Sequence, residues 1–79
     1  MSRCPPLPQA VTVYRQPRKD SDVKGVLAAG TLLDQCHRVP DFPDWYSIGY
    51  WQQDDHRPRA YKRGYIHLKI NRDEWRAVS

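Results

Sequence analysis

The stretch from Trp45 to Ile66 constrains the fold of this chain more than any other part of the sequence. It begins with WYSIGYW and ends with AYKRGYI, and a polar run from Gln52 to Arg59 lies between these two segments. Aromatic residues at alternating or near-alternating positions are typical of a β-hairpin with one buried face and one aromatic face. We therefore expect a hairpin whose polar run forms a long loop, and further strands that pack against it.

Length and composition limit the chain to one small domain. Its 79 residues allow a single, thin hydrophobic core. Charged residues at 28% and hydrophobic residues at 39% are typical of a folded domain rather than a disordered chain. No apolar run approaches the roughly 18 residues of a transmembrane helix, and the N-terminal MSRCPP lacks the apolar segment of a signal peptide. We expect a soluble, monomeric protein in the cytoplasm.

The two cysteines, Cys4 and Cys36, do not define a disulfide framework. In a cytosolic protein we expect reduced thiols, with Cys36 acting as a small buried residue. A bridge between them would tie the N-terminal tail to a strand and would need an oxidising compartment. Together with His37, His56 and His67 they show no zinc-ligand spacing, so we expect no metal and no other cofactor.

Short strands are predicted on the N-terminal side of the hairpin. Residues 10–14 alternate Val with Thr and Tyr, and apolar residues surround Gly25 in a second short strand. A third strand is expected at 31–39, where the adjacent leucines Leu32 and Leu33 leave the inward register open. Without a long helical period anywhere, this order predicts an all-β fold, a small barrel or roll.

Turns and ends follow from Gly, Pro and Asp. We expect Gly30 to take a positive φ in a turn, Gly64 to mark a close backbone approach, and residues 40–44 to form a loop. Residues 1–9 form a Pro-rich tail, either a stiff lead-in or a segment that resembles a peptide ligand. Residues 71–79 are expected to form a short C-terminal helix, since Asn and Glu three residues apart favour its start.

Several of these segments, taken in order, resemble the bacterial SH3-like (SH3b) domains. The resemblance covers residues 10–70 and implies a barrel of about five strands between the tail and the helix. Two departures are the long charged hairpin loop and Tyr65, which stands where Trp is common in the family. The segments that carry the resemblance are VTVYRQP at 11–17, DVKGVLAAGT at 22–31, WYSI at 45–48 and GYIH at 64–67.

The resemblance implies binding of a protein or peptide rather than catalysis. Carried over by position, the family's groove involves Tyr14, Trp45 and Tyr65, with Arg18 and Asp44 at its margin. Aromatic side chains on a strand face are also frequent binding hot spots, which supports this interpretation independently. The alternative is that Trp45 and Tyr65 only cover a thin core. We expect a small cytoplasmic regulator or inhibitor.

Two other functions remain open. The net charge is +4, and its excess lies near residues 57–69, a region able to attract nucleic acid or an acidic protein surface, or to serve solubility alone. Binding of peptidoglycan, a property of the family, is disfavoured by the missing signal peptide. The second candidate patch, for nucleic acid, comprises Trp51, Arg57, Arg59, Tyr61, Lys62 and Arg63.

Catalysis is not expected. Cys36 and His37 are adjacent, and neighbours on a strand face opposite sides of the sheet, so they cannot act as nucleophile and base. Residues 54–56, Asp-Asp-His, fall in the predicted loop, which is a poor place to hold catalytic geometry. The chain also lacks a glycine-rich phosphate-binding loop.

Overall fold

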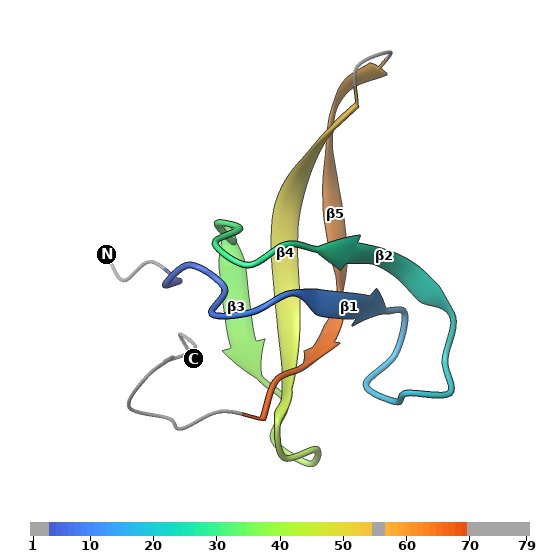
Figure 1. The fold of residues 1–79 in the computed structure, drawn as a ribbon. Helices are drawn as coiled ribbons and strands as arrows, with labels where there is room; N and C mark the ends of the chain where they lie inside the picture. Colours follow the sequence, from blue (N-terminus) through green and yellow to red (C-terminus); the bar gives the residue numbers. More distant parts are fainter. Residues whose placement is uncertain (1–3, 55–56, 70–79) are drawn as a thin grey trace.

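The computed structural model describes residues 4–54 and 57–69 and shows one sheet of five antiparallel strands (Figure 1). The all-β class and the number of strands expected from the sequence are confirmed. The sheet order is β2-β1-β5-β4-β3, so β2 and β3 are its edges and the sheet is open rather than closed into a barrel. The strands are β1 (Val11–Tyr14), β2 (Val23–Leu27), β3 (Gln35–Arg38), β4 (Trp45–Asp54) and β5 (Arg57–His67).

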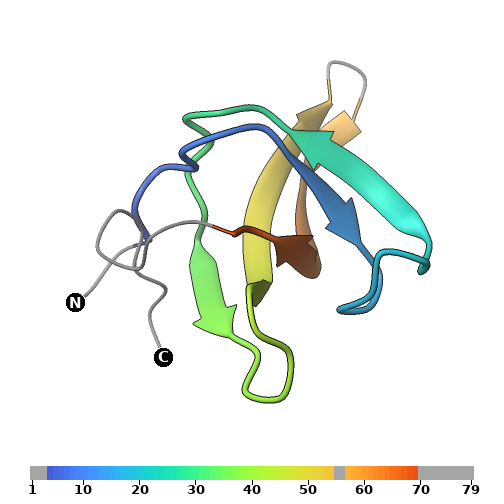
Figure 2. The ribbon, with the colours of Figure 1, turned by 60° about the horizontal axis from the view of Figure 1, so that its bottom comes forward.

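The sheet is strongly curled. Figures 1 and 2 show β1 and β2 crossing over the long β4–β5 hairpin instead of lying parallel to it. Within residues 4–54 and 57–69, β1 pairs with β5 at two positions, Val13 with Ile66 and Tyr14 with Tyr65. Among the described residues, this short joint connects the β1–β2 pair to the other three strands.

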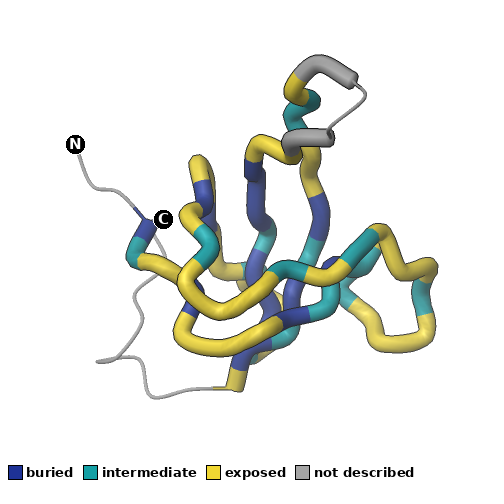
Figure 3. The backbone as a smooth tube through the Cα atoms, turned by 45° about the horizontal axis from the view of Figure 1, so that its top comes forward, coloured by how far each residue is buried: buried dark blue, intermediate teal, exposed yellow. Residues whose placement is uncertain are grey.

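Alternation along the strands separates an inner face, which forms the core, from an outer face. Figure 3 shows the buried positions recurring along β4 and β5. Tyr46, Ile48 and Ile66 are buried, as expected for scaffold residues, and Leu33 is buried whereas Leu32 is 73% exposed, which decides the register left open by the sequence. The buried core residues are Cys4, Leu7, Val11, Val13, Leu33, Cys36, Tyr46, Ile48, Tyr50, Ile66 and Leu68.

The segment before β1 takes part in this core, although it forms no strand. The side chain of Leu7 is only 2% exposed. Its backbone N–H donates to the carbonyl oxygen of Thr31 at 3.0 Å, and its own carbonyl accepts from the N–H of Gly30 at 2.7 Å. Gly30 has a φ of 85°, which confirms the turn expected there. The Pro-rich segment is therefore held by apolar burial and by backbone hydrogen bonds.

A disulfide joins Cys4 to Cys36 on β3, with their Cα atoms 6.0 Å apart. The expectation of two reduced thiols is thus wrong, whereas the burial expected for Cys36 is confirmed. The reason is tertiary: docking of Leu7 carries Cys4 to β3, although 32 positions separate the two cysteines in the sequence.

Gly64 allows the joint between β1 and β5 to form. A Cβ atom at this position would clash with Cγ1 of Val13 and would lie 3.1 Å from the carbonyl oxygen of Tyr14. The close backbone approach expected at Gly64 is confirmed. On the other side of β1, the register with β2 shifts between Val13 and Tyr14, at the bend expected near Gly25.

The expectation of a long loop from Gln52 to Arg59 is wrong. β4 continues to Asp54 and β5 begins at Arg57, so only residues 55–56 separate the two strands. The outer half of the hairpin projects from the body (Figure 1), where no core requires apolar alternation, and its polar sequence therefore resembled a loop. The register shifts between Gln52 and Asp54, and such an irregularity accommodates the nearby Pro58, which has no N–H to donate.

Two other boundaries differ or stay untested. The third strand is shorter than expected, Gln35–Arg38 instead of 31–39, because residues 28–34 turn to place Leu33 in the core. The helix expected at 71–79 lies outside the described residues.

Replacement of Leu7 by Ala tests whether the N-terminal segment belongs to the core. Because this side chain is buried, Leu7→Ala is expected to lower the free energy of unfolding by about 2–5 kcal/mol. The exposed Leu32 is the matched control, and Leu32→Ala should change it by less than about 0.5 kcal/mol. Urea denaturation followed by circular dichroism measures both, and equal effects would show that Leu7 is not a core residue.

Reduction of the disulfide should lower the free energy of unfolding by about 2–4 kcal/mol, because cleavage of the Cys4–Cys36 bond removes a constraint on the unfolded chain. The measurement is urea denaturation with and without dithiothreitol, with thiols counted by mass spectrometry after alkylation. Cys4→Ser/Cys36→Ser should reproduce the reduced protein and be insensitive to dithiothreitol. Two free thiols in the non-reduced protein would contradict the pairing.

Candidate functional site

The outer face carries most of the side chains that the sequence singled out for binding. Tyr14 on β1 lies opposite Tyr65 on β5, which in turn lies opposite Ser47 on β4. Trp45 and His67 form the next pair on the same face, because Trp45 precedes Ser47 by two residues and His67 follows Tyr65 by two. The structure therefore brings Tyr14, Trp45 and Tyr65 to one region, as the SH3-like resemblance implied.

Trp45 is the centre of this aromatic cluster. Its ring meets Tyr14 edge-to-face with centroids 5.5 Å apart, and meets His67 edge-to-face at 5.2 Å. The indole is only 9% exposed, whereas Tyr14, Tyr65 and His67 are half-buried. Edge-to-face pairs add about 0.5–1.5 kcal/mol to the burial of their area. Trp45 thus supports the cluster, and its neighbours supply the accessible surface.

His67 was missed as a site residue by the sequence analysis. It stands two positions after Tyr65, and the alternation of β5 places both side chains on the outer face. That spacing was a usable signal. The predicted hairpin ends at Ile66, and the pairing of His67 with Trp45 depends on the hairpin register.

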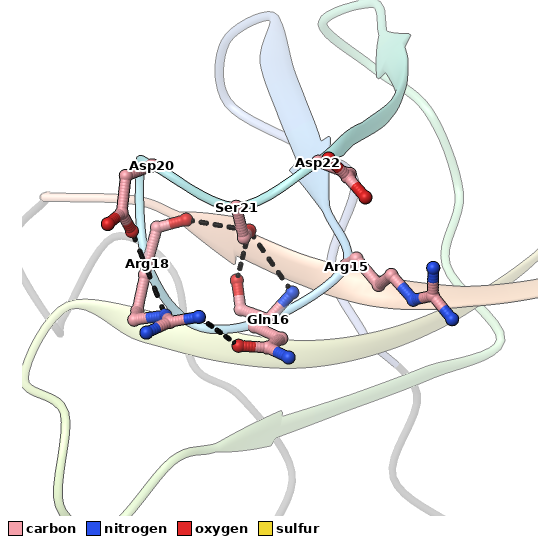
Figure 4. A pocket seen from close by; sticks show the side chains of 6 residues that line it. All are labelled: Arg15, Gln16, Arg18, Asp20, Ser21 and Asp22. Carbon is pink, nitrogen blue, oxygen red and sulfur yellow. Dashed lines mark hydrogen bonds and ion pairs between the residues drawn. The ribbon is translucent and has the colours of Figure 1, made fainter.

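Arg18 lies in the loop that connects β1 to β2, which encloses a hollow of about 210 Å³ (Figure 4). The Ser21 hydroxyl accepts from the N–H of Gln16 at 3.2 Å and donates to the carbonyl oxygen of Arg18 at 2.8 Å. The Arg18 guanidinium donates to the Gln16 side chain and lies 3.7 Å from the Asp20 carboxylate. The loop is therefore organised by its own polar contacts. Its lining residues are Arg15, Gln16, Arg18, Asp20, Ser21 and Asp22.

Asp44 has a structural role in the turn before β4. Its φ of 66° is left-handed, a conformation that Asp tolerates better than most residues. Its carbonyl oxygen accepts from the N–H of Leu68 at 2.8 Å, and the N–H of Trp45 donates to the carbonyl of Phe42 at 3.1 Å. The turn thus fixes where Trp45 enters β4 and how the chain leaves β5. Arg18 is thus held by contacts within its own loop, and Asp44 by a backbone hydrogen bond to Leu68 after β5.

A second group of side chains forms a ladder of rings and guanidinium groups further along the hairpin. The Arg59 guanidinium carbon lies 5.3 Å from the Trp51 ring centroid. Trp51 meets Tyr61 edge-to-face at 5.0 Å, and the Arg63 guanidinium carbon lies 5.8 Å from the Tyr61 ring centroid. Trp51 is 52% exposed. Most of the second candidate patch is therefore one contiguous unit, whereas Lys62 is exposed on the opposite face of β5. The side chain of Arg57 is outside the described part.

Tyr61 ties this ladder to the body of the domain. Its ring crosses Gly49, where a Cβ atom would clash with the hydroxyl, and the hydroxyl donates to Oδ2 of Asp34 at 3.2 Å. Lys24 donates to the carbonyl oxygen of Arg63 from the other side. Asp34, Gly49 and Lys24 were not predicted as site residues. A glycine within an aromatic strand was the one available signal.

The environment changes the proton affinity of two tyrosines. Burial raises the pKa of Tyr61, and the hydrogen bond to Asp34 and the negative charge of this carboxylate raise the pKa further, while Arg63 lowers it. Burial also raises the pKa of Tyr50. The Tyr61 hydroxyl thus keeps its proton to higher pH in the folded state than in the unfolded chain.

No protein-family model, curated protein or solved structure matched this chain, so the SH3-like resemblance stays a prediction. Within the described ranges 4–54 and 57–69, no three His, Cys, Asp or Glu side chains are grouped so as to hold a metal ion. Among the same residues, no helix has the length and apolar character that crossing a membrane requires.

Tyr61→Phe tests the Tyr61–Asp34 contact through its pH dependence. Because the pKa of Tyr61 is raised in the folded state, its contribution to stability is complete below pH 10 and is lost as pH rises through the folded pKa. Wild type should be more stable than Tyr61→Phe at pH 8, and the difference should shrink towards pH 11. Urea midpoints of both proteins at pH 8, 9.5 and 11 measure this difference. A difference independent of pH would contradict the contact.

Proposed function

We propose that this chain is a non-enzymatic binding module, an SH3-like protein- or peptide-binding regulator or inhibitor. The observation that carries the proposal is the aromatic cluster on the outer face, in which Tyr14, Tyr65 and His67 surround the buried Trp45. Half-buried aromatic side chains supply a large contact area with few rotatable bonds, so little conformational entropy is lost on binding.

Trp45 contributes to this surface indirectly. Buried at 9% exposure, its indole offers a partner little area, but its two edge-to-face contacts hold Tyr14 and His67 in place. A surface that is ordered before binding pays a smaller ordering cost when the partner arrives. We therefore assign the contacts with the partner to the surrounding rings. Tyr65 is the residue best suited to a test, because it lies on β5 between Tyr14 of β1 and Ser47 of β4.

The loop after β1 provides polar contacts at the margin. It follows Tyr14 directly, and its hollow is lined by Arg15 and Arg18 as well as Asp20 and Asp22. Charges of both signs suit a peptide that carries polar side chains beside an apolar or aromatic anchor. The cytoplasmic location expected from the sequence is not part of the proposal, because a disulfide such as Cys4–Cys36 persists in oxidising compartments.

Selection of peptides from a random phage-displayed library on the immobilised, oxidised protein tests the proposal. An enriched peptide, measured by calorimetry, is expected to bind Tyr65→Ser at least about tenfold more weakly, since removal of an aromatic hot spot costs about 2 kcal/mol or more. Leu32→Ser, which removes an exposed apolar side chain elsewhere, should bind within about twofold of wild type.

Two results would overturn this function. One is a library selection that enriches no sequence over the empty support. The other is an enriched peptide whose affinity is lowered equally by Tyr65→Ser and Leu32→Ser. Urea midpoints of both variants are measured alongside, so that a loss of fold is not taken for a loss of contact.

A further inference from the structure

The outer half of the β4–β5 hairpin projects from the body as a two-stranded ribbon (Figure 1), which we call the arm, residues 50–54 and 57–63. β3 pairs with β4 only as far as Gly49, and β1 pairs with β5 only at Tyr65 and Ile66. In the described structure, both edges of the arm therefore lie beyond the neighbouring strands. Tyr50 at the base of the arm is buried in the core, whereas the face that carries Trp51, Arg59 and Arg63 is exposed to a partner.

The arm is cationic where its side chains are described. Arg59, Lys62 and Arg63 are exposed, and the described side chains at 50–52 and 59–63 include no acid. The carboxylate next to this group, Asp34, accepts a hydrogen bond from Tyr61. Lys24 adds a further cation near Arg63. Between these two described segments the sequence carries Asp54, Asp55 and Arg57, whose side chains lie outside the described part. The charge that faces a partner along β5 is thus positive.

Rings and cations alternate along the same face of the arm. Arg59, Tyr61 and Arg63 occupy every second position of β5, which spaces them by about 6.7 Å and separates the two guanidinium groups' backbones by about 13 Å. Trp51 stands beside Tyr61 on β4 and leaves half of its surface exposed. A ligand that runs along this face meets positive charge and a π-surface in turn.

We propose that the arm binds single-stranded nucleic acid, with Arg59 and Arg63 on phosphates and Trp51 stacking against a base. Single-strand binding surfaces combine a cationic track for the backbone with aromatic rings on which bases stack. This site lies further along the same face of the hairpin as the aromatic cluster around Trp45, with Arg63 two positions from Tyr65 on β5. The inference does not depend on the proposed peptide binding.

The rings favour nucleic acid over an acidic protein as the partner. An acidic peptide would satisfy the guanidinium groups, but it offers no planar ring to the exposed indole of Trp51. A nucleic acid strand supplies anionic groups and planar bases at each nucleotide, and stacking is tolerant of base identity. The ladder also stabilises the arm, since a two-stranded hairpin is marginal by itself. Stabilisation alone, however, does not require Trp51 to stay half exposed.

Fluorescence anisotropy of a fluorescein-labelled 15-nucleotide oligo(dT), titrated with the oxidised full chain at 20–200 mM KCl, tests the inference. Arg59→Gln/Arg63→Gln is expected to weaken binding at least about tenfold at 50 mM KCl. Each phosphate contact to a single strand contributes about 0.7 to the slope of log affinity against log salt, so this slope should fall by about 1.4.

The matched control is Lys19→Gln/Arg38→Gln, two exposed cations outside the arm. Both double variants lower the net charge from +4 to +2, because each removes two positive charges. The control should bind within about twofold of wild type with the same slope. Trp51→Ala should weaken binding about five- to hundredfold, whereas Trp51→Phe, which keeps a ring, should retain most of the affinity. Urea midpoints of every variant show whether the fold is kept.

Several results would overturn the inference. One is the absence of an anisotropy change at 20 mM KCl, and another is equal weakening by the two double variants. A labelled ten-residue poly-Glu peptide that binds as tightly as the oligonucleotide would assign the arm to acidic proteins instead. Equal affinity of Trp51→Ala and wild type, or stronger competition by duplex DNA of the same length, would remove base stacking from the site.

Discussion

The structure depends on a very short contact between its two parts. β1 meets β5 through Val13 opposite Ile66 and Tyr14 opposite Tyr65, and this contact joins the β1–β2 pair to the β3–β4–β5 meander. The strands approach this closely because Gly64 has no side chain where Val13 packs. The two residue pairs of the joint serve opposite faces of the sheet. Val13 and Ile66 lie fully buried in the core, and Tyr14 and Tyr65 begin the aromatic cluster on the outer face.

A core this small needs help from outside the strands. Leu7 closes it from the N-terminal segment, and the disulfide from Cys4 to Cys36 ties the same segment to the edge strand β3. Both contacts bridge parts of the chain that are distant in sequence, so they add most to the stability of a domain with a thin core. An open sheet therefore persists without closing into a barrel.

Burial divides the aromatic residues into supports and candidate contact residues. Trp45 and Trp51 belong to the same strand and the same face, yet their exposure is 9% and 52%. The difference follows from position along the hairpin, because Trp45 lies where β1 and the end of β5 surround it, and Trp51 lies on the projecting arm. Two chemically distinct surfaces result, one aromatic with a polar margin and one of alternating cations and rings.

The residue pattern alone predicts the all-β class, the two faces of the Trp45–Trp51 strand, the turn at Gly30 and the close approach at Gly64. These properties are local, because alternation and the special conformations of glycine act over a few residues. Packing between distant segments brings Cys4 to Cys36 and makes the polar run after Trp51 a strand. It also decides that His67 pairs with Trp45 and that Asp34 accepts from Tyr61. Each of these depends on register and on packing between distant segments, and an exposed ribbon has no buried face whose pattern would reveal it in the sequence.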